Sequence, residues 1–139
     1  MYLSGSQSSR GNILITGAIG DYGKVRRIKG QKDFSLVKLH KGTFEINTSK
    51  LIAATNSATP TRNTATCSYS RSATAPVTVL DGTGLYAGIS GTLNFTVYYA
   101  ETGPLYTSGS QKGQCNTSNS AVPYAQFATA LGMGTVNFS

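Results

Sequence analysis

The chain has few side chains that could transfer a proton, and His40 and Glu45 are the pair that the sequence brings closest to each other. It contains five acidic residues and a single histidine. A histidine and a glutamate beside basic residues are the residue types that cleave RNA through its 2′-hydroxyl, with Lys38 or Arg27 stabilising the developing charge. A second histidine to share the acid and base roles is missing, and a surface ion pair explains the same residues. The sequence therefore assigns no catalytic residue.

Basic residues are concentrated in the window 22–41. The window holds Lys24, Arg26, Arg27, Lys29, Lys32, Lys38 and Lys41. These seven positive charges, opposed by Asp33 alone, carry +6 of the net charge of +7. Such a segment attracts nucleic acid, anionic glycans or anionic lipid. We predict anion binding at Lys24, Arg26, Arg27, Lys29 and Lys32. A solvated basic hairpin is the alternative.

Two cysteines, Cys67 and Cys115, lie in the polar contexts TATCSYS and KGQCNTS. This setting predicts a disulfide and a secreted or extracellular protein, here in its mature form because no signal-peptide pattern is visible. Closing this loop contributes about 4 kcal/mol in the chain-entropy model. Two reduced thiols are the alternative. Two cysteines and one distant histidine do not favour a metal site, and no cofactor is expected.

The strands that must position these groups are clearest in a predicted β-hairpin over residues 34–48. Its two halves, FSLVKLH and TFEINTS, flank Lys41-Gly42, which would form a two-residue loop. Counting from that loop gives the cross-strand pairs. They are Leu39 with Phe44 and Val37 with Ile46 on the core face, and Lys38 with Glu45 on the outer face.

Most of the remaining chain also has the pattern of short strands. Strands are expected over 12–19, 24–29, 77–80, 92–100 and 125–138, with a turn over 20–23 and a bulge or bend near Gly132 and Gly134. Residues 55–76 are predicted to be a loop or a marginal strand. No window of ten or more residues has a helical period, and no apolar run approaches the ~20 residues of a membrane span. The prediction is an all-β domain over 12–139, preceded by a flexible leader over 1–11.

The stretch DGTGLYAGISG (81–91) has four glycines around one tyrosine: Gly82, Gly84, Gly88, Gly91 and Tyr86. A strand followed by GTG is compatible with a nucleotide-binding loop. That loop needs a helix after the glycines, and the next segment alternates like a strand instead. We therefore interpret the stretch as a sharp structural corner, with Tyr86 folded over it.

The segment VTVLDGTGLYAGISGTLNF (77–95) resembles the strand–glycine-corner–strand pattern of the allene oxide cyclase and dirigent-like superfamily. The resemblance implies an antiparallel eight-stranded β-barrel, whereas the pattern of short strands by itself also allows a β-sandwich. Such barrels can hold an apolar ligand, and relatives guide cyclisations or radical couplings largely by shape. Relatives are often dimers or trimers, which makes a homo-oligomer an expectation here.

Three functions follow from these observations. The first is a secreted barrel that binds a small apolar ligand between its inward faces, at Phe44, Ile46, Phe95, Val97 and Tyr99. The second is a cyclase-like enzyme that acts by the shape of the barrel cavity, with Tyr99 as the best inward polar group. The third is an interaction protein that binds an anionic polymer through the basic segment 24–41.

Overall fold

The computed structural model describes residues 1–5, 10–118 and 120–139, and its main element is a single antiparallel sheet. The strands are β1 (Tyr2–Gly5), β2 (Arg10–Ile15), β3 (Asp21–Ile28), β4 (Gln31–Leu39), β5 (Gly42–Asn47), β6 (Thr61–Asn63), β7 (Ser68–Gly84), β8 (Ile89–Thr102) and β9 (Ala125–Phe138). One short helix, α1 (Ser49–Ser57), lies between β5 and β6. Among the described residues, no helix has the length and apolar character that crossing a membrane requires. The predicted all-β class is confirmed.

Eight of the strands form a ring in chain order. Each of β1 to β4 pairs with the next strand, β5 pairs with β7, and β7, β8 and β9 pair in turn. The ring closes because β9 pairs with β1. Closure satisfies the backbone groups that an open sheet would expose at its edges. The result is the expected antiparallel eight-stranded barrel, with β6 added to the far half of β7.

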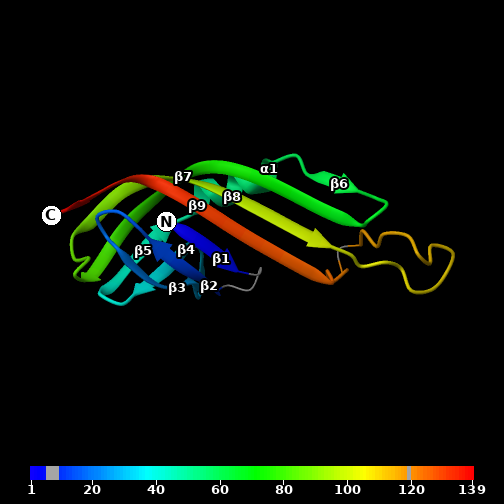
Figure 1. Cartoon of the computed structure of the whole chain (residues 1–139), viewed down its shortest axis with the longest axis horizontal. Coiled ribbons are helices and arrows are strands. Elements are labelled where there is room, and N and C mark those ends of the chain that lie inside the picture. The colour runs from blue at the N-terminus through cyan, green and yellow to red at the C-terminus, as the bar shows by residue number, and fades with distance from the viewer. Residues whose placement is uncertain (6–9, 119) are drawn as a thin grey trace.

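Three strands are much longer than the rest and leave the barrel together (Figure 1). β7 has 17 residues, and β8 and β9 have 14 each. Their pairing continues to the last residues of β8, where Thr102 lies opposite both Ser68 and Ala125. We call the part of β7, β8 and β9 beyond the barrel the arm. The loop 103–124 joins β8 to β9 at its far end (Figure 1).

The barrel interior is filled by the inward side chains, which alternate with outward ones along each strand. On β8, Leu93 and Phe95 are buried, whereas Asn94 and Thr96 are exposed, as period-2 alternation requires. Residues from most strands join one cluster. It contains Met1, Ile13, Ile15, Val37, Leu39, Phe44, Ile46, Val77, Val79, Tyr86, Ile89, Leu93 and Phe95.

The expectation of a flexible leader over residues 1–11 is wrong for residues 2–5. They form β1, in which Leu3 lies opposite Ile13 of β2 and Ala130 of β9. Met1 and Gly132 exchange two backbone hydrogen bonds of 2.9 Å. The segment is ordered because the ring needs a strand between β2 and β9, a requirement that its own short sequence does not reveal. The leader prediction is also wrong for residues 10 and 11, which begin β2, and residues 6–9 lie outside the described residues.

The predicted hairpin register is wrong by two residues. Val37 lies opposite Phe44 and Lys38 opposite Thr43, so four residues rather than two lie between the last pair of opposite residues. Glu45 therefore faces Leu36, and the predicted Lys38–Glu45 pair does not form. The wider turn is held from outside the hairpin, since the Lys41 N–H donates to a carboxylate oxygen of Asp21 at 3.1 Å. A two-residue slip keeps every side chain on its predicted face.

Three further expectations are corrected. Residues 49–57 form α1, which packs against β7 and contributes Leu51 to the edge of the core. Nine residues carry too weak a periodic signal, so tertiary packing decides the helix. Residues 68–76, predicted as loop or marginal strand, belong to the long strand β7. Asp21 begins β3 instead of lying in a turn over 20–23.

β9 is one uninterrupted strand, without the bulge predicted near its two glycines. A Cβ on Gly132 would lie 2.5 Å from Cζ of Phe95, and one on Gly134 would lie 2.5 Å from the Thr92 carbonyl oxygen. The glycines therefore let β9 pass close over β8. The apolar side chains next to them, Leu131 and Met133, point outward and are exposed, which explains the shifted pattern.

Candidate functional site

The glycine-rich corner connects β7 to β8. Gly82 and Gly84 end β7, Gly88 precedes β8, and Gly91 lies within it. Gly84 and Gly88 have φ values of +62° and +74°, which favour glycine. Tyr86 points into the core, is 3% exposed, and contacts Phe44 edge to face at 5.7 Å between ring centroids. The corner therefore fixes a core residue.

Tyr86 also ends at the buried carboxylate of Asp21. Its hydroxyl donates to Oδ2 at 2.5 Å, and the N–H groups of Tyr22 and Lys41 donate at 2.8 Å and 3.1 Å. Burial raises the pKa of Asp21, but these donors and the His40 backbone outweigh it and lower that pKa to about 2. Burial, together with the carboxylate it contacts, raises the pKa of Tyr86 to about 12. Asp21 is thus a permanently charged structural anchor at neutral pH.

The five side chains predicted to bind a ligand divide into two groups. Phe44, Ile46 and Phe95 lie in the packed core and are at most 2% exposed. Val97 and Tyr99 lie further along β8, on the inward face of the arm, opposite Ala73 and Arg71 of β7. The structure therefore does not bring the five together around one space.

A cavity of about 340 Å³ opens at the far end of the arm, and we call it the arm pocket. It lies where the β6–β7 hairpin, the end of β8 and the loop 103–124 meet. Its lining includes Arg62, Asn63, Thr64, Ser68, Tyr69, Arg71, Tyr99, Glu101, Asn116, Thr117 and Ser118. Most of these side chains end in hydroxyl, amide or guanidinium groups, so the lining of the pocket is largely polar.

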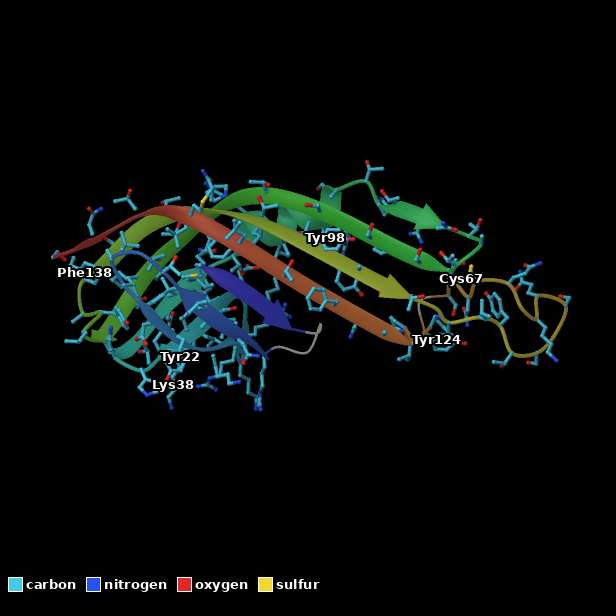
Figure 2. The ribbon with its side chains drawn as sticks, viewed as in Figure 1. Tyr22, Lys38, Cys67, Tyr98, Tyr124 and Phe138 are labelled. Atoms are coloured by element: carbon cyan, nitrogen blue, oxygen red, sulfur yellow. A yellow bond between two sulfur atoms is a disulfide. The ribbon has the colours of Figure 1, made fainter. Side chains whose placement is uncertain are left out.

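The predicted disulfide lies in the wall of the arm pocket. Cys67 and Cys115 are bonded, with their Cα atoms 5.4 Å apart. Figure 2 shows Cys67 beside the base of the loop 103–124. The bond ties this loop to the start of β7, which fixes the two sides of the pocket relative to each other.

Two arginines and a tyrosine form the cationic side of the pocket. The guanidinium carbon of Arg62 lies 4.7 Å from the centre of the Tyr69 ring, and that of Arg71 lies 5.9 Å from it. Both are cation–π distances. The Arg71 Nε is buried and has no hydrogen-bond acceptor among the described residues. A buried donor of this kind calls for a partner.

Tyr99 and Glu101 line the pocket from the neighbouring strand β8, where they lie opposite Arg71 and Tyr69 of β7. The Tyr99 hydroxyl contacts a carboxylate oxygen of Glu101 and lies 3.2 Å from the Gln126 side-chain oxygen. Burial and then the Glu101 carboxylate raise the pKa of Tyr99, against the opposing effect of the Arg71 charge. Tyr99 is therefore a protonated donor at neutral pH, and it fixes the Glu101 side chain.

Sequence reasoning found only Tyr99 and the two cysteines of this site. A usable signal was present in SYSRSATAPVTVL, where Tyr69, Arg71, Ala73, Ala75, Val77 and Val79 keep one parity. Because Val77 and Val79 face the core, the same parity places Tyr69 and Arg71 on the inward face. The partners from β6 and β8 depend on strand pairing, which the sequence does not state.

The predicted anion-binding residues lie on β3, in the turn that follows it and at the start of β4. All five of Lys24, Arg26, Arg27, Lys29 and Lys32 are exposed. Lys24 and Arg26 point outward from the barrel wall, whereas Lys29 and Lys32 flank the β3–β4 turn. Arg27 precedes an irregularity in the β3–β4 register. Figure 2 shows nitrogen-tipped side chains gathered on the side of the barrel that carries Tyr22 and Lys38.

A third surface is apolar and lies on the outer face of β8 and β9. Tyr98, Phe127, Leu131 and Met133 are between 41% and 71% exposed there. A homo-oligomer stays a prediction. Among the described residues, no cluster of three or more histidine, cysteine or acidic side chains is arranged to hold a metal ion.

No family model, no curated protein and no solved structure matches this chain. The resemblance of residues 77–95 to the allene oxide cyclase and dirigent-like superfamily therefore stays a prediction.

Proposed function

We propose that the protein binds a small anionic sugar, such as a sugar acid or a sugar phosphate, in the arm pocket. The observation that carries the proposal is the buried Arg71 Nε, which lacks an acceptor among the described residues. Guanidinium groups pair with carboxylates and phosphates through two parallel hydrogen bonds. The proposal thus assigns the acidic group of the ligand to Arg71.

The other lining residues support a ligand that also carries hydroxyl groups. Asn63, Asn116 and Ser118 present amide and hydroxyl groups, which both donate and accept hydrogen bonds. Tyr69 offers an aromatic face beside the two arginines. Two guanidinium groups against the single carboxylate of Glu101 leave the pocket with a positive charge. A cavity of about 340 Å³ is at the lower end of the range for small-molecule sites.

The proposed function is binding alone, with no catalysed reaction. Tyr99 and Glu101 are a donor and an acceptor that already engage each other, which suits positioning of the pocket wall. The cyclase-like reading stays a prediction. The Cys67–Cys115 bond forms part of the pocket wall. The proposed function therefore includes an oxidising compartment, such as the one in which a secreted protein works.

Calorimetric titration with glucuronate, glucose 6-phosphate and glucose tests the proposal. We expect one of the two anions to bind and glucose not to bind. Arg71→Gln should weaken binding about 10- to 100-fold, since hydrogen bonds to charged groups are worth about 1.5–3 kcal/mol. The matched control is Lys112→Gln, which removes one charge from the exposed surface of the loop 103–124. Glucose binding as tightly as the anions, or an equal effect of both substitutions, would overturn the proposal.

A second candidate keeps the predicted apolar ligand but moves it to the barrel wall. A cavity of about 340 Å³ lies between the turn 16–19 and β9, where β1 is too short to fill the ring. Ile15, Ile19, Leu93 and Val136 line it. Titration with Nile red, a neutral apolar probe, should saturate at this site, and Ile19→Glu should abolish the signal. An unchanged signal in that variant would exclude the site.

A further inference from the structure

The outer surface of β2, β3 and β4 carries paired like charges. We call Arg10, Lys24, Arg26 and Lys38 the basic face; all four are exposed. Arg10 lies directly opposite Arg26 across β2 and β3, and Lys24 lies directly opposite Lys38 across β3 and β4. Like charges in such positions destabilise a sheet. A surface that keeps two of these pairs is therefore arranged for an anionic partner rather than for stability.

The alternation of β3 makes the basic face continuous. Residues 21, 23 and 25 point inward, and Tyr22, Lys24 and Arg26 point outward along the same strand. Outward side chains of a strand follow one another at about 7 Å. The Lys24 ammonium also donates to the side-chain oxygen of Asn12, which holds one cation in place over β2.

An exposed aromatic pair continues the basic face at one end. The Tyr22 ring is 57% exposed and lies 4.9 Å from the His40 ring, centre to centre. Tyr22 is the outward neighbour of Lys24 on β3, and Figure 2 shows it close to Lys38. A flat aromatic surface beside a row of cations is the combination that binds single-stranded nucleic acid, because every base has a face that stacks.

We propose that the basic face binds single-stranded nucleic acid, with backbone phosphates at Lys24, Arg26 and Lys38 and a base stacked on Tyr22. An acidic polysaccharide would use the same cations; the proposal commits to nucleic acid because every base presents a flat face that can stack on the exposed ring. The proposal concerns the barrel wall and is independent of the arm pocket, which lies at the far end of the molecule (Figure 2).

Fluorescence anisotropy with a labelled oligothymidylate, at about 20 to 200 mM salt, tests the charge part of the proposal. Each cation that pairs with a single-stranded phosphate adds about −0.7 to the slope of log affinity against log salt. Arg26→Gln combined with Lys38→Gln should thus make the slope shallower by about 1.4. Lys50→Gln with Lys112→Gln removes the same charge from α1 and the loop 103–124, and it should leave the slope unchanged. Equal effects of the two double variants would overturn the proposal.

Tyr22→Ala distinguishes nucleic acid from other polyanions. Loss of one stacked base should weaken oligothymidylate binding roughly 5- to 150-fold and leave the salt slope unchanged. Inorganic polyphosphate has no bases, so its binding should not respond to this substitution. An equal response of both ligands, or of neither, would mean that the surface reads charge alone, and the nucleic-acid proposal would then be wrong.

Discussion

The hydroxyl of Tyr86 donates a 2.5 Å hydrogen bond to the carboxylate of Asp21, a residue 65 positions earlier in the chain. The same carboxylate accepts the N–H of Lys41, in the turn between β4 and β5. One side chain therefore joins the start of β3, a hairpin turn and the glycine-rich corner. This end of the barrel depends on a single buried charge, which makes its contribution to stability measurable by pH.

Stability should fall in acid through Asp21. Its pKa is about 2 in the folded protein, against an ordinary value of 3.8. A carboxyl whose pKa is lowered by folding stabilises the protein above its ordinary pKa, and this contribution is lost as the pH falls from 3.8 towards 2. In urea unfolding at pH 7, the free energy of unfolding of Asp21→Asn should be well below that of the wild type. The difference between the two should become smaller in acid. Glu45→Gln is the control. A gap that stays constant with pH would contradict the assignment.

Tyr86→Phe should destabilise the protein while preserving its core packing. The substitution removes one donor to a buried carboxylate and keeps the ring that contacts Phe44. Loss of a hydrogen bond to a charged group costs about 2 kcal/mol. Denaturant unfolding at pH 7 measures the loss. Tyr124→Phe, at a ring that is 66% exposed, should cost far less, and equal losses would contradict this account.

Gly132→Ala should destabilise the barrel, because its Cβ would lie 2.5 Å from Cζ of Phe95. Overpacking of this kind costs about 1–3 kcal/mol. The same substitution should cost less in a Phe95→Leu background, where the ring is absent. Urea unfolding of the two single variants and the double variant gives the coupling. Purely additive effects would show that the two residues do not clash.

Breaking the Cys67–Cys115 bond should lower the free energy of unfolding by about 4 kcal/mol, the loop-closure value for a segment of this length. Cys67→Ser combined with Cys115→Ser removes the bond, and reduction of the wild type should reach the same midpoint in urea. The double variant itself should not respond to reductant. Weaker binding of the preferred anion to the reduced protein would further connect the bond with the arm pocket.

Local patterns in the sequence were sufficient to predict strands whose side chains alternate between core and solvent. The alternation of Leu93, Phe95 and Tyr99 predicted β8, although over 92–100 in place of Ile89–Thr102. The eight-stranded barrel was expected from the resemblance of residues 77–95, since the strand pattern is also typical of a sandwich. The predicted faces of the hairpin were right. Its register was wrong because the turn is held by Asp21, which lies far from the turn in sequence. A short helix such as α1 carries too few residues for a periodic signal.

The arm pocket was mostly hidden for a different reason. Its two arginines come from β6 and β7, Tyr99 and Glu101 from β8, and Asn116 from the loop 103–124. None of these groups is special in its own segment. They meet because β7 and β8 pair far beyond the barrel and because the disulfide returns the loop to β7. Strand pairing and the disulfide together create the site.

β8 has hydrogen-bonded neighbours on both sides along its whole length outside the glycine corner, from the barrel to the tip of the arm. Barrel and arm therefore share their central strand and should unfold as one cooperative unit. A ligand that binds only the folded arm then raises the melting temperature of the entire protein. Amide protons deep in the barrel should exchange more slowly in its presence. Binding of a ligand in the arm can thus be detected by amide exchange in the barrel.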